Sequence, residues 1–287
     1  MKNKPLNKRD LSISTILYRI FTFLGIALTI LVIVSIIGYI LITGIPNLSA
    51  DIFAWEYNSD NGSMMPAIIN TVIVVLLSLI VAVPLGVGSA VYLCEYAKTG
   101  NPLVKVVRLT TETLSGIPSI VYGLFGSLFF VRFCGFGLSI ISGALTLAIM
   151  ILPIIMRTTE EALLMVPIGY KEGSYGLGAG KLRTVSKIII PSAMPGILSG
   201  ILLGTGRIVG ETVALLFTAG SVAAIAADIT KSGRTLSVHM YALSNEGLHI
   251  PKAQATAVVL LVIVVLLNGL SAVVAGKLTK SKDKESK

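Results

Sequence analysis

The stretch from residue 68 to residue 93 reads IINTVIVVLLSLIVAVPLGVGSAVYL and contains no charged side chain. A helix needs about 20 consecutive apolar residues to span a bilayer. The run lacks the alternation of apolar and polar residues that marks barrel strands, so it predicts a transmembrane helix. Five other stretches have the same character: Leu17–Ile42, Thr110–Phe133, Leu138–Met156, Ala193–Ala219 and Ala255–Ala275. We therefore expect an all-α integral membrane protein with about six transmembrane helices.

The composition agrees with a chain that is largely embedded in lipid. Of the 287 residues, 54% are hydrophobic and 13% are charged, whereas soluble domains carry roughly 25% charged residues. The net charge of +9 does not indicate nucleic-acid binding, because the basic residues form short clusters between apolar runs. Cys94 and Cys134 are expected at opposite membrane faces, as free thiols. His239 and His249 are expected to pack in a loop and to bind no metal.

The basic residues sort to one side of the membrane if the chain crosses it six times. Of the 23 lysines and arginines, 18 fall in four segments: the N-terminal region, the segments after the second and fourth spans, and the C-terminal tail. The positive-inside rule places such segments in the cytoplasm. We therefore expect a multi-pass protein of the plasma membrane with both termini cytoplasmic.

These expectations divide the chain into four parts. Residues 1–16 form a cytoplasmic tail, residues 17–65 the first transmembrane helix with its outer loop, residues 66–276 the core, and residues 277–287 a second cytoplasmic tail. Within the core, a long polar connection spans residues 157–191. A loop of this length with structure of its own is usually functional.

The glycine-rich centre of this connection, GLGAGK at residues 176–181, has some likeness to a phosphate-binding P-loop. A P-loop would need glycine in place of Tyr175, serine or threonine in place of Leu182, and a preceding strand. We therefore predict that this chain binds no nucleotide.

The same connection resembles the EAA loop of ABC-importer permeases. The resemblance is carried by Glu172, Gly173, Ser174, Gly178, Ile188, Ile190 and Pro191. Gly173 and Ser174 stand where the pattern has two alanines, and Ile190 where it has leucine. The resemblance implies the type I ABC-importer (MetI-like) core, in which residues 157–191 dock into a groove on a separate ATPase. Gly178 would permit a sharp turn there.

Three further segments are similar to phosphate permeases of the PstA type: LSGIPSIVYGLFG at 114–126, GRIVGET at 206–212 and LLFTAG at 215–220. The resemblance implies a bacterial importer of inorganic phosphate. It implies three kinds of protein partner: a homologous PstC-type permease, PstB-type ATPases and an external PstS-type phosphate-binding protein. The chain itself would be no enzyme and hold no cofactor, since the ATPase subunits use the ATP.

Two charges, Arg207 and Glu211, lie within the expected fifth span. Each intramembrane charge costs on the order of 2.5–3.5 kcal/mol, and the i, i+4 spacing places both on one face of a continuous helix. Glycines share that face, so it should point to the bundle interior or to a partner subunit. The resemblance implies a phosphate pathway that includes Arg207, Glu211, Thr212 and Thr218. An ion pair that only joins helices is the structural alternative.

Weaker candidates lie in the third span, where Pro118 should kink the helix. Glu112 is expected to be an interfacial charge. The hydroxyls of Thr111 and Ser115 could line a path or bond to their own backbone.

Other functions are also open. The chain could carry another oxyanion, such as sulfate or molybdate, or act as an ATP-independent channel or carrier. A membrane enzyme is less favoured, because no nucleophile, base and orienting group are grouped in the sequence.

Overall fold

The computed structural model describes residues 13–285 except 99 and 248. Every regular element in this part of the chain is helical. The elements are α1 (Ile13–Gly44), η1 (Ile45–Asn47), η2 (Ala50–Phe53), α2 (Met65–Val91), η3 (Tyr92–Tyr96), α3 (Pro102–Ser115), α4 (Ser119–Gly126), η4 (Ser127–Phe133), α5 (Ile140–Leu164), α6 (Ile168–Gly176), α7 (Lys181–Thr184), η5 (Val185–Ile189), α8 (Ile190–Gly210), α9 (Val213–Thr218), α10 (Leu236–Glu246) and α11 (Ile250–Glu285). The all-α membrane fold is thus confirmed.

Five helices in the described residues are long and apolar enough to cross a membrane, and a bent pair can supply the sixth crossing. The bent pair corrects the expectation of one continuous third span. Here α3 and the α4–η4 segment meet at an angle of 106°. Pro118 explains the break, because a proline disfavours helical geometry in the residue before it. The expected kink at Pro118 is therefore a sharp turn between two helices.

The fifth span is also interrupted, which corrects the expectation of one helix over residues 193–219. Helix α8 ends at Gly210, and Glu211 has an extended backbone with φ −75° and ψ 126°. The chain then resumes as the short helix α9. Arg207 and Glu211 therefore do not share a helix face, and the i, i+4 geometry expected for them is wrong.

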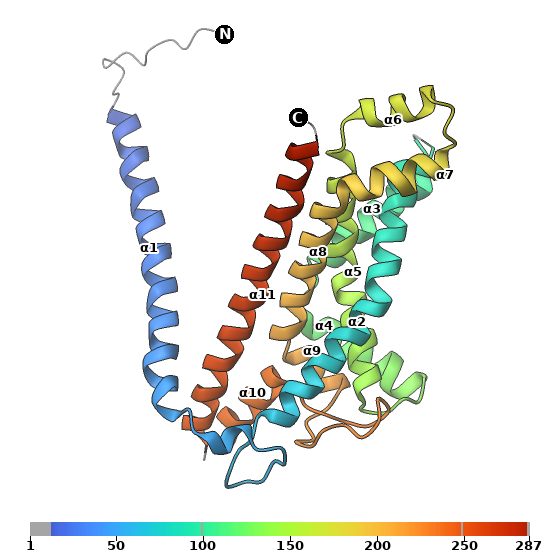
Figure 1. Cartoon of the computed structure of the whole chain (residues 1–287). Coiled ribbons are helices and arrows are strands. Elements are labelled where there is room, and N and C mark those ends of the chain that lie inside the picture. The colour runs from blue at the N-terminus through green and yellow to red at the C-terminus, as the bar shows by residue number, and fades with distance from the viewer. Residues whose placement is uncertain (1–12, 99, 248, 286–287) are drawn as a thin grey trace.

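Helix α5 lies at the centre of the bundle, where it packs against α2 and α8 (Figure 1). Its side chains Leu147, Ile151 and Ile155 are completely buried. The glycines of α8 face this helix: a Cβ at Gly196 would lie 2.5 Å from the Cβ of Ala162. The glycine stripe thus faces the bundle interior, as expected. Arg207, by contrast, is exposed and does not continue the stripe.

Helix α1 stands apart from the bundle over most of its length (Figure 1). Its most apolar stretch is wholly unburied in this chain. It touches α11 through its outer end, where a Cβ at Gly44 would overlap Val258. Figure 1 shows the start of α1, the end of α11 and helix α6 at the same end of the molecule, as the sorting of basic residues requires.

Close packing between α5 and α8 yields a first prediction. A Cβ at Gly200 would overlap the hydroxyl of Thr158, so Gly200→Ala should destabilise the chain by about 1–3 kcal/mol through overpacking. The midpoint of thermal unfolding of the detergent-purified chain would report the loss. Gly25→Ala is the matched control, because no atom lies within 4 Å of a Cβ at that position. Equal midpoints for the two variants would contradict the packing.

Candidate functional site

The two interrupted helices meet inside the bundle, where α4 packs against α9. A Cβ at Gly123 would lie 2.9 Å from the Cα of Ala214, so the backbones approach closely. The Tyr122 hydroxyl donates a 2.7 Å hydrogen bond to the carbonyl of Leu114, across the first break. Irregular backbone at membrane depth is tolerated only where it is buried in protein or lines a polar cavity. The paired breaks therefore mark a candidate site.

Arg207 lies one turn before the second break, and its side chain is exposed on this chain. The guanidinium is close enough to Tyr122 for the two groups to interact electrostatically. None of the ion pairs formed among the described residues includes Arg207. An intramembrane guanidinium without a carboxylate partner remains available to an anion.

Glu211 has a different role from the one expected. Its side chain is buried, and Oε1 accepts a 3.1 Å hydrogen bond from the backbone N–H of Ala214 in the first turn of α9. Its backbone carbonyl accepts a 2.5 Å hydrogen bond from the Ser237 hydroxyl. In this conformation Glu211 stabilises the break and does not neutralise Arg207.

The two threonines of the expected pathway differ in environment. Thr212 is half-buried directly at the break. Thr218 is fully buried, and its hydroxyl donates a 2.7 Å hydrogen bond to the carbonyl of Ala214 within its own helix. Of the four expected pathway residues, only Arg207 is therefore exposed at the surface of the subunit.

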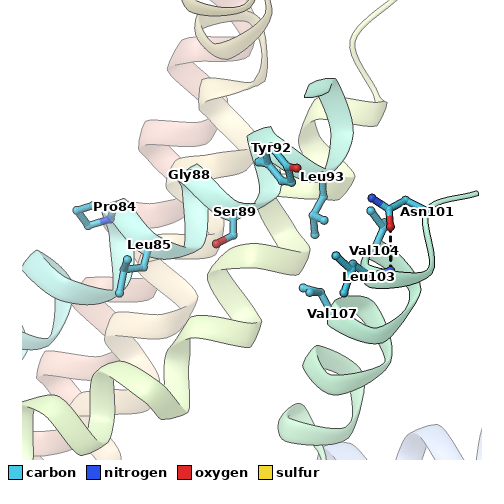
Figure 2. A pocket seen from close by; sticks show the side chains of 10 residues that line it. All are labelled: Pro84, Leu85, Gly88, Ser89, Tyr92, Leu93, Asn101, Leu103, Val104 and Val107. Carbon is cyan, nitrogen blue, oxygen red and sulfur yellow. Dashed lines mark hydrogen bonds between the residues drawn. The ribbon is translucent and has the colours of Figure 1, made fainter. Parts of the chain in front are cut away.

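An apolar groove of about 610 Å³ lies between the end of α2 and the start of α3 (Figure 2). Its lining includes Leu85, Leu93, Leu103 and Val107. Asn101 caps α3 beside it by accepting a 3.0 Å hydrogen bond from the N–H of Leu103. The groove lining contains no charged residue, so it is unsuited to an anion.

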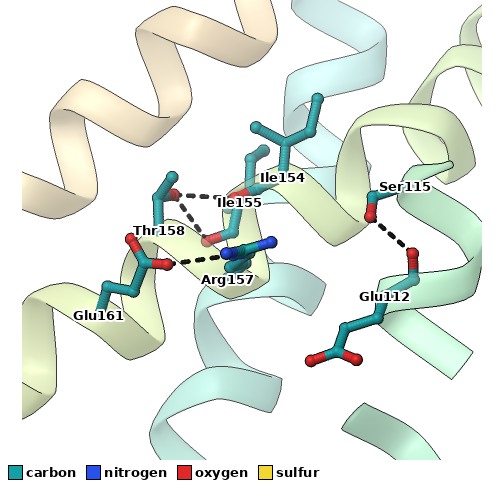
Figure 3. A network of polar contacts seen from close by, with 7 residues as sticks. All are labelled: Glu112, Ser115, Ile154, Ile155, Arg157, Thr158 and Glu161. Atoms are coloured by element: carbon teal, nitrogen blue, oxygen red, sulfur yellow. Dashed lines mark hydrogen bonds and ion pairs between the residues drawn. The ribbon is translucent and has the colours of Figure 1, made fainter. Parts of the chain in front are cut away.

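A smaller cleft of about 280 Å³ between α3 and α5 is lined by charges of both signs. Arg108 contacts Glu160 at 2.5 Å, and the Arg157 Nε donates to Glu161 at 3.0 Å. Glu112 lies on the α3 side of this cleft (Figure 3). The Arg108–Glu160 pair was not anticipated, since its partners are on different helices.

The hydroxyls considered in the third span bond to their own helix. Thr111 donates to the carbonyl of Val107 at 2.8 Å. Ser115 donates to the carbonyl of Glu112 at 2.7 Å (Figure 3). Backbone bonding is the alternative that the sequence left open.

The connection at residues 157–191 has a compact structure of its own. The buried Ser174 hydroxyl is 2.8 Å from that of Thr184, which joins α6 to α7. Between the helices Gly178 adopts a φ of +80°, a conformation open to glycine at little cost. Glu172 and Gly173 are exposed, Ile188 is half-buried in η5 and Pro191 is exposed in the first turn of α8. The turn expected at Gly178 is confirmed.

Two charged side chains contact the end of α2 from this connection, beside the apolar cluster that includes Leu93 and Ile189. The Lys171 Nζ lies 2.6 Å from Oε1 of the buried Glu95 in η3. This contact does not meet the geometry of a hydrogen bond, so the attraction between the ammonium group and the carboxylate is chiefly Coulombic. Lys181 lies over the ring of Tyr96, 5.0 Å from its centroid. Movement of α6 should therefore be transmitted to α2.

Apolar side chains cover the outward surface of the connection. We call this set the α6 surface: Leu164, Met165, Ile168, Tyr170, Tyr175, Leu177 and Leu182. Leu177 is 91% exposed. Exposed apolar side chains that gather within a polar segment are typical of an interaction surface.

A sequence model of the family described as "Binding-protein-dependent transport system inner membrane component" matches residues 82–280, which include both helix breaks and the whole α6 connection. The chain belongs to this family. It is thus a membrane component of an ABC importer.

Curated relatives narrow the comparison. The "Probable ABC transporter permease protein YqgI" of Bacillus subtilis is 36% identical over 84% of this permease and 87% of its own length. The "Phosphate transport system permease protein PstA 1" of Mycobacterium tuberculosis is 40% identical over 58% of this permease and 55% of its own length. The "Phosphate transport system permease protein PstA" of Pasteurella multocida is 37% identical over 61% of this permease and 63% of its own length.

Solved transporters share the fold. The inward-facing MetNI methionine ABC transporter matches with a TM-score of 0.57 and 19% identity, over 75% of this permease and 94% of that chain. A bacterial alginate ABC transporter, in complex with a periplasmic protein bound to an alginate pentasaccharide, matches with a TM-score of 0.64 and 18% identity, over 93% and 97%. At these identities the likeness establishes the MetI-like architecture alone.

Proposed function

We propose that this permease imports inorganic phosphate, and that Arg207 draws the anion into the pathway. The observation that carries the proposal is the exposed guanidinium of Arg207 beside two interrupted helices, without a carboxylate partner among the described ion pairs. A guanidinium is permanently charged and matches a tetrahedral oxyanion through two parallel hydrogen bonds. Several relatives carry phosphate transport in their names.

The exposure of Arg207 also indicates where the pathway runs. A charge facing acyl chains would be costly, so this face of α8 is better placed against a second, homologous permease subunit of the PstC type. The pathway would then lie between the two subunits, with Arg207 and the half-buried Thr212 contributed by this chain. Glu211 would keep the break in shape, and the buried Thr218 would support α9.

ATP would be used by separate ATPase subunits of the PstB type, with no cofactor held by this chain. The α6 surface would fit a groove on the ATPase, and Gly173 leaves room for close approach because no atom lies within 4 Å of a Cβ there. An external PstS-type protein would deliver phosphate to the opposite face. This arrangement places both termini in the cytoplasm of a bacterium.

Sulfate or molybdate would also suit a guanidinium, so the substrate needs a direct test. We expect a strain that lacks this chain to lose high-affinity uptake of labelled phosphate and to regain it on complementation. A 100-fold excess of unlabelled phosphate should abolish the labelled signal, and the same excess of sulfate or molybdate should not. Unchanged uptake in the deletion strain would reject the proposal. Failure of an ATPase to copurify with this chain would instead favour a channel or carrier.

A further inference from the structure

A buried arginine lies on the outer side of the bundle, away from Arg207. Arg234 precedes α10 and is only 4% exposed. Its guanidinium carbon lies 4.4 Å from the centroid of the Tyr57 ring. The same ring meets His239, which is completely buried, edge to face at a centroid distance of 6.0 Å. Residues from two loops that are far apart in the chain thus enclose one positive charge.

This charge has no partner that would explain its burial. The Nε and Nη2 atoms of Arg234 and both ring nitrogens of His239 make no hydrogen bond to described residues. None of the ion pairs in the described part of the chain includes Arg234. Buried charges are normally paired, because removing an ion from water costs several kcal/mol even after relaxation. A cation–π contact with one ring offsets only part of that cost.

His239 adds a hydrogen-bonding group without adding a charge. Burial, and then the positive charge of Arg234, lower its pKa to about 4, so the ring is neutral at physiological pH. A neutral imidazole offers one N–H donor. The backbone of Gly62 approaches the ring but does not meet hydrogen-bond geometry. Two unsatisfied guanidinium nitrogens and one imidazole donor are therefore grouped around the ring of Tyr57.

The loop that carries Tyr57 packs against this cluster. The N–H of Met64 donates to the carbonyl of Ile52 at 2.8 Å, and Lys252 contacts the carbonyl of Asp60. Tyr57 itself is half-buried, and its ring packs over the nearly inaccessible guanidinium of Arg234. The base of the loop is anchored, because Ile52 and Met64 are buried in one cluster with Leu236, so only the part that carries Tyr57 would have to move.

The cluster is connected to the break in the fifth span. The carbonyl of Arg234 accepts a 3.2 Å hydrogen bond from Asn70 of α2. Three residues later, the hydroxyl of Ser237 bonds to the carbonyl of Glu211. A change at Arg234 is therefore mechanically linked to the segment that positions Arg207.

We propose that Arg234 and His239 form an outer binding site for a tetrahedral oxyanion, which Tyr57 covers when the site is empty. The anion would supply the missing counter-charge and would accept hydrogen bonds from the free guanidinium and imidazole nitrogens. The site would receive the anion after it leaves the binding protein and before it reaches Arg207. Its assignment to phosphate rests on the proposed function, whereas the presence of an anion site does not.

Trp55 provides a local probe, since it is the single tryptophan of the chain and lies two residues from Tyr57. The full chain, purified in detergent at constant ionic strength, would be titrated with potassium phosphate while the Trp55 emission is recorded. We expect a saturable change in emission in the wild type. Arg234→Met keeps the apolar stem of the side chain. It should raise the phosphate concentration at half-saturation about tenfold or more, because the charge-assisted bonds are lost.

Arg132→Met is the matched control: it removes an exposed arginine and should leave the titration unchanged. Tyr57→Ala removes the ring that covers the site. Phosphate should therefore saturate the change in Trp55 emission at a lower concentration than in the wild type.

The possible outcomes distinguish the two proposals. The absence of saturation with both phosphate and sulfate, or an Arg234→Met titration equal to that of the wild type, would overturn the outer site. If Arg234→Met does not fold, Arg234→Lys would be titrated in its place. We expect its phosphate affinity to be lower than that of the wild type but still measurable, and an affinity equal to that of the wild type would contradict the proposal. A response to sulfate but not to phosphate would support the anion site and count against phosphate as its ligand.

Discussion

Replacing Arg207 with glutamine should reduce phosphate uptake by the assembled importer by about 10- to 100-fold, the effect expected for losing hydrogen bonds from a charged group worth roughly 1.5–3 kcal/mol. Glutamine keeps the approximate length of the side chain and removes the charge. Because Arg207 is exposed and has no carboxylate partner in the described ion pairs, its loss leaves no buried charge unpaired. The fold and the assembly should therefore survive.

Initial rates of labelled-phosphate uptake would be compared at equal amounts of assembled complex, quantified by copurification of the ATPase. Arg207→Lys should retain part of the rate, since lysine keeps the charge but loses the planar fork. Arg132→Gln is the matched control, because Arg132 is also exposed but lies at the end of η4 outside the helix breaks. Normal uptake by a correctly assembled Arg207→Gln complex would exclude a role in transport.

The transmembrane architecture could be predicted from the sequence because it depends on composition. A run such as residues 68–93 can be accommodated only in lipid or in a core, and α2 does span this region. The position of the α6 connection followed from its polar length and its glycines. Gly178 adopts the positive φ that was anticipated for it. Local signals of this kind do not require knowledge of the neighbouring helices.

The break at Glu211 could not be predicted in the same way. No proline marks it, and Gly210 is one of many glycines in these helices. The break is stabilised by tertiary contacts, above all the bond from Ser237 to the Glu211 carbonyl. A helical projection that assumes an unbroken span therefore placed Glu211 on the same face as Arg207. Pro118 did signal the other break, although not its 106° angle.

The cluster of Tyr57, Arg234 and His239 could not be predicted from the sequence either. Arg234 and Tyr57 lie in separate loops, and their contact depends on how Asn70 holds the later loop against α2. The sequence predicted that His239 would pack in a loop, but the residue lies in helix α10, where it is completely buried. That His239 and a buried guanidinium without an ion-pair partner among the described residues contact the same tyrosine ring follows only from the structure.

The second large effect is expected at the ion pair between Lys171 and Glu95. Lys171→Met leaves the carboxylate of Glu95 buried without its partner, and breaking a buried pair in this way costs about 3–5 kcal/mol. We expect uptake to fall about tenfold or more, because α6 loses its ion pair with the end of α2. The nearby cation–π contact comes from Lys181 of α7 and is worth only roughly 0.5–1 kcal/mol at an exposed site. ATP hydrolysis by the complex should persist.

A double variant separates stability from transmission. Lys171→Met combined with Glu95→Gln removes both charges, so the thermal stability of the chain should return towards that of the wild type. If the ion pair carries the motion of the ATPase into α2, uptake should remain low although stability has recovered, and phosphate uptake per ATP hydrolysed should fall in both variants. Recovery of uptake together with stability would show that the pair only holds the fold, and that α6 drives the bundle through its continuity with α5 and α8.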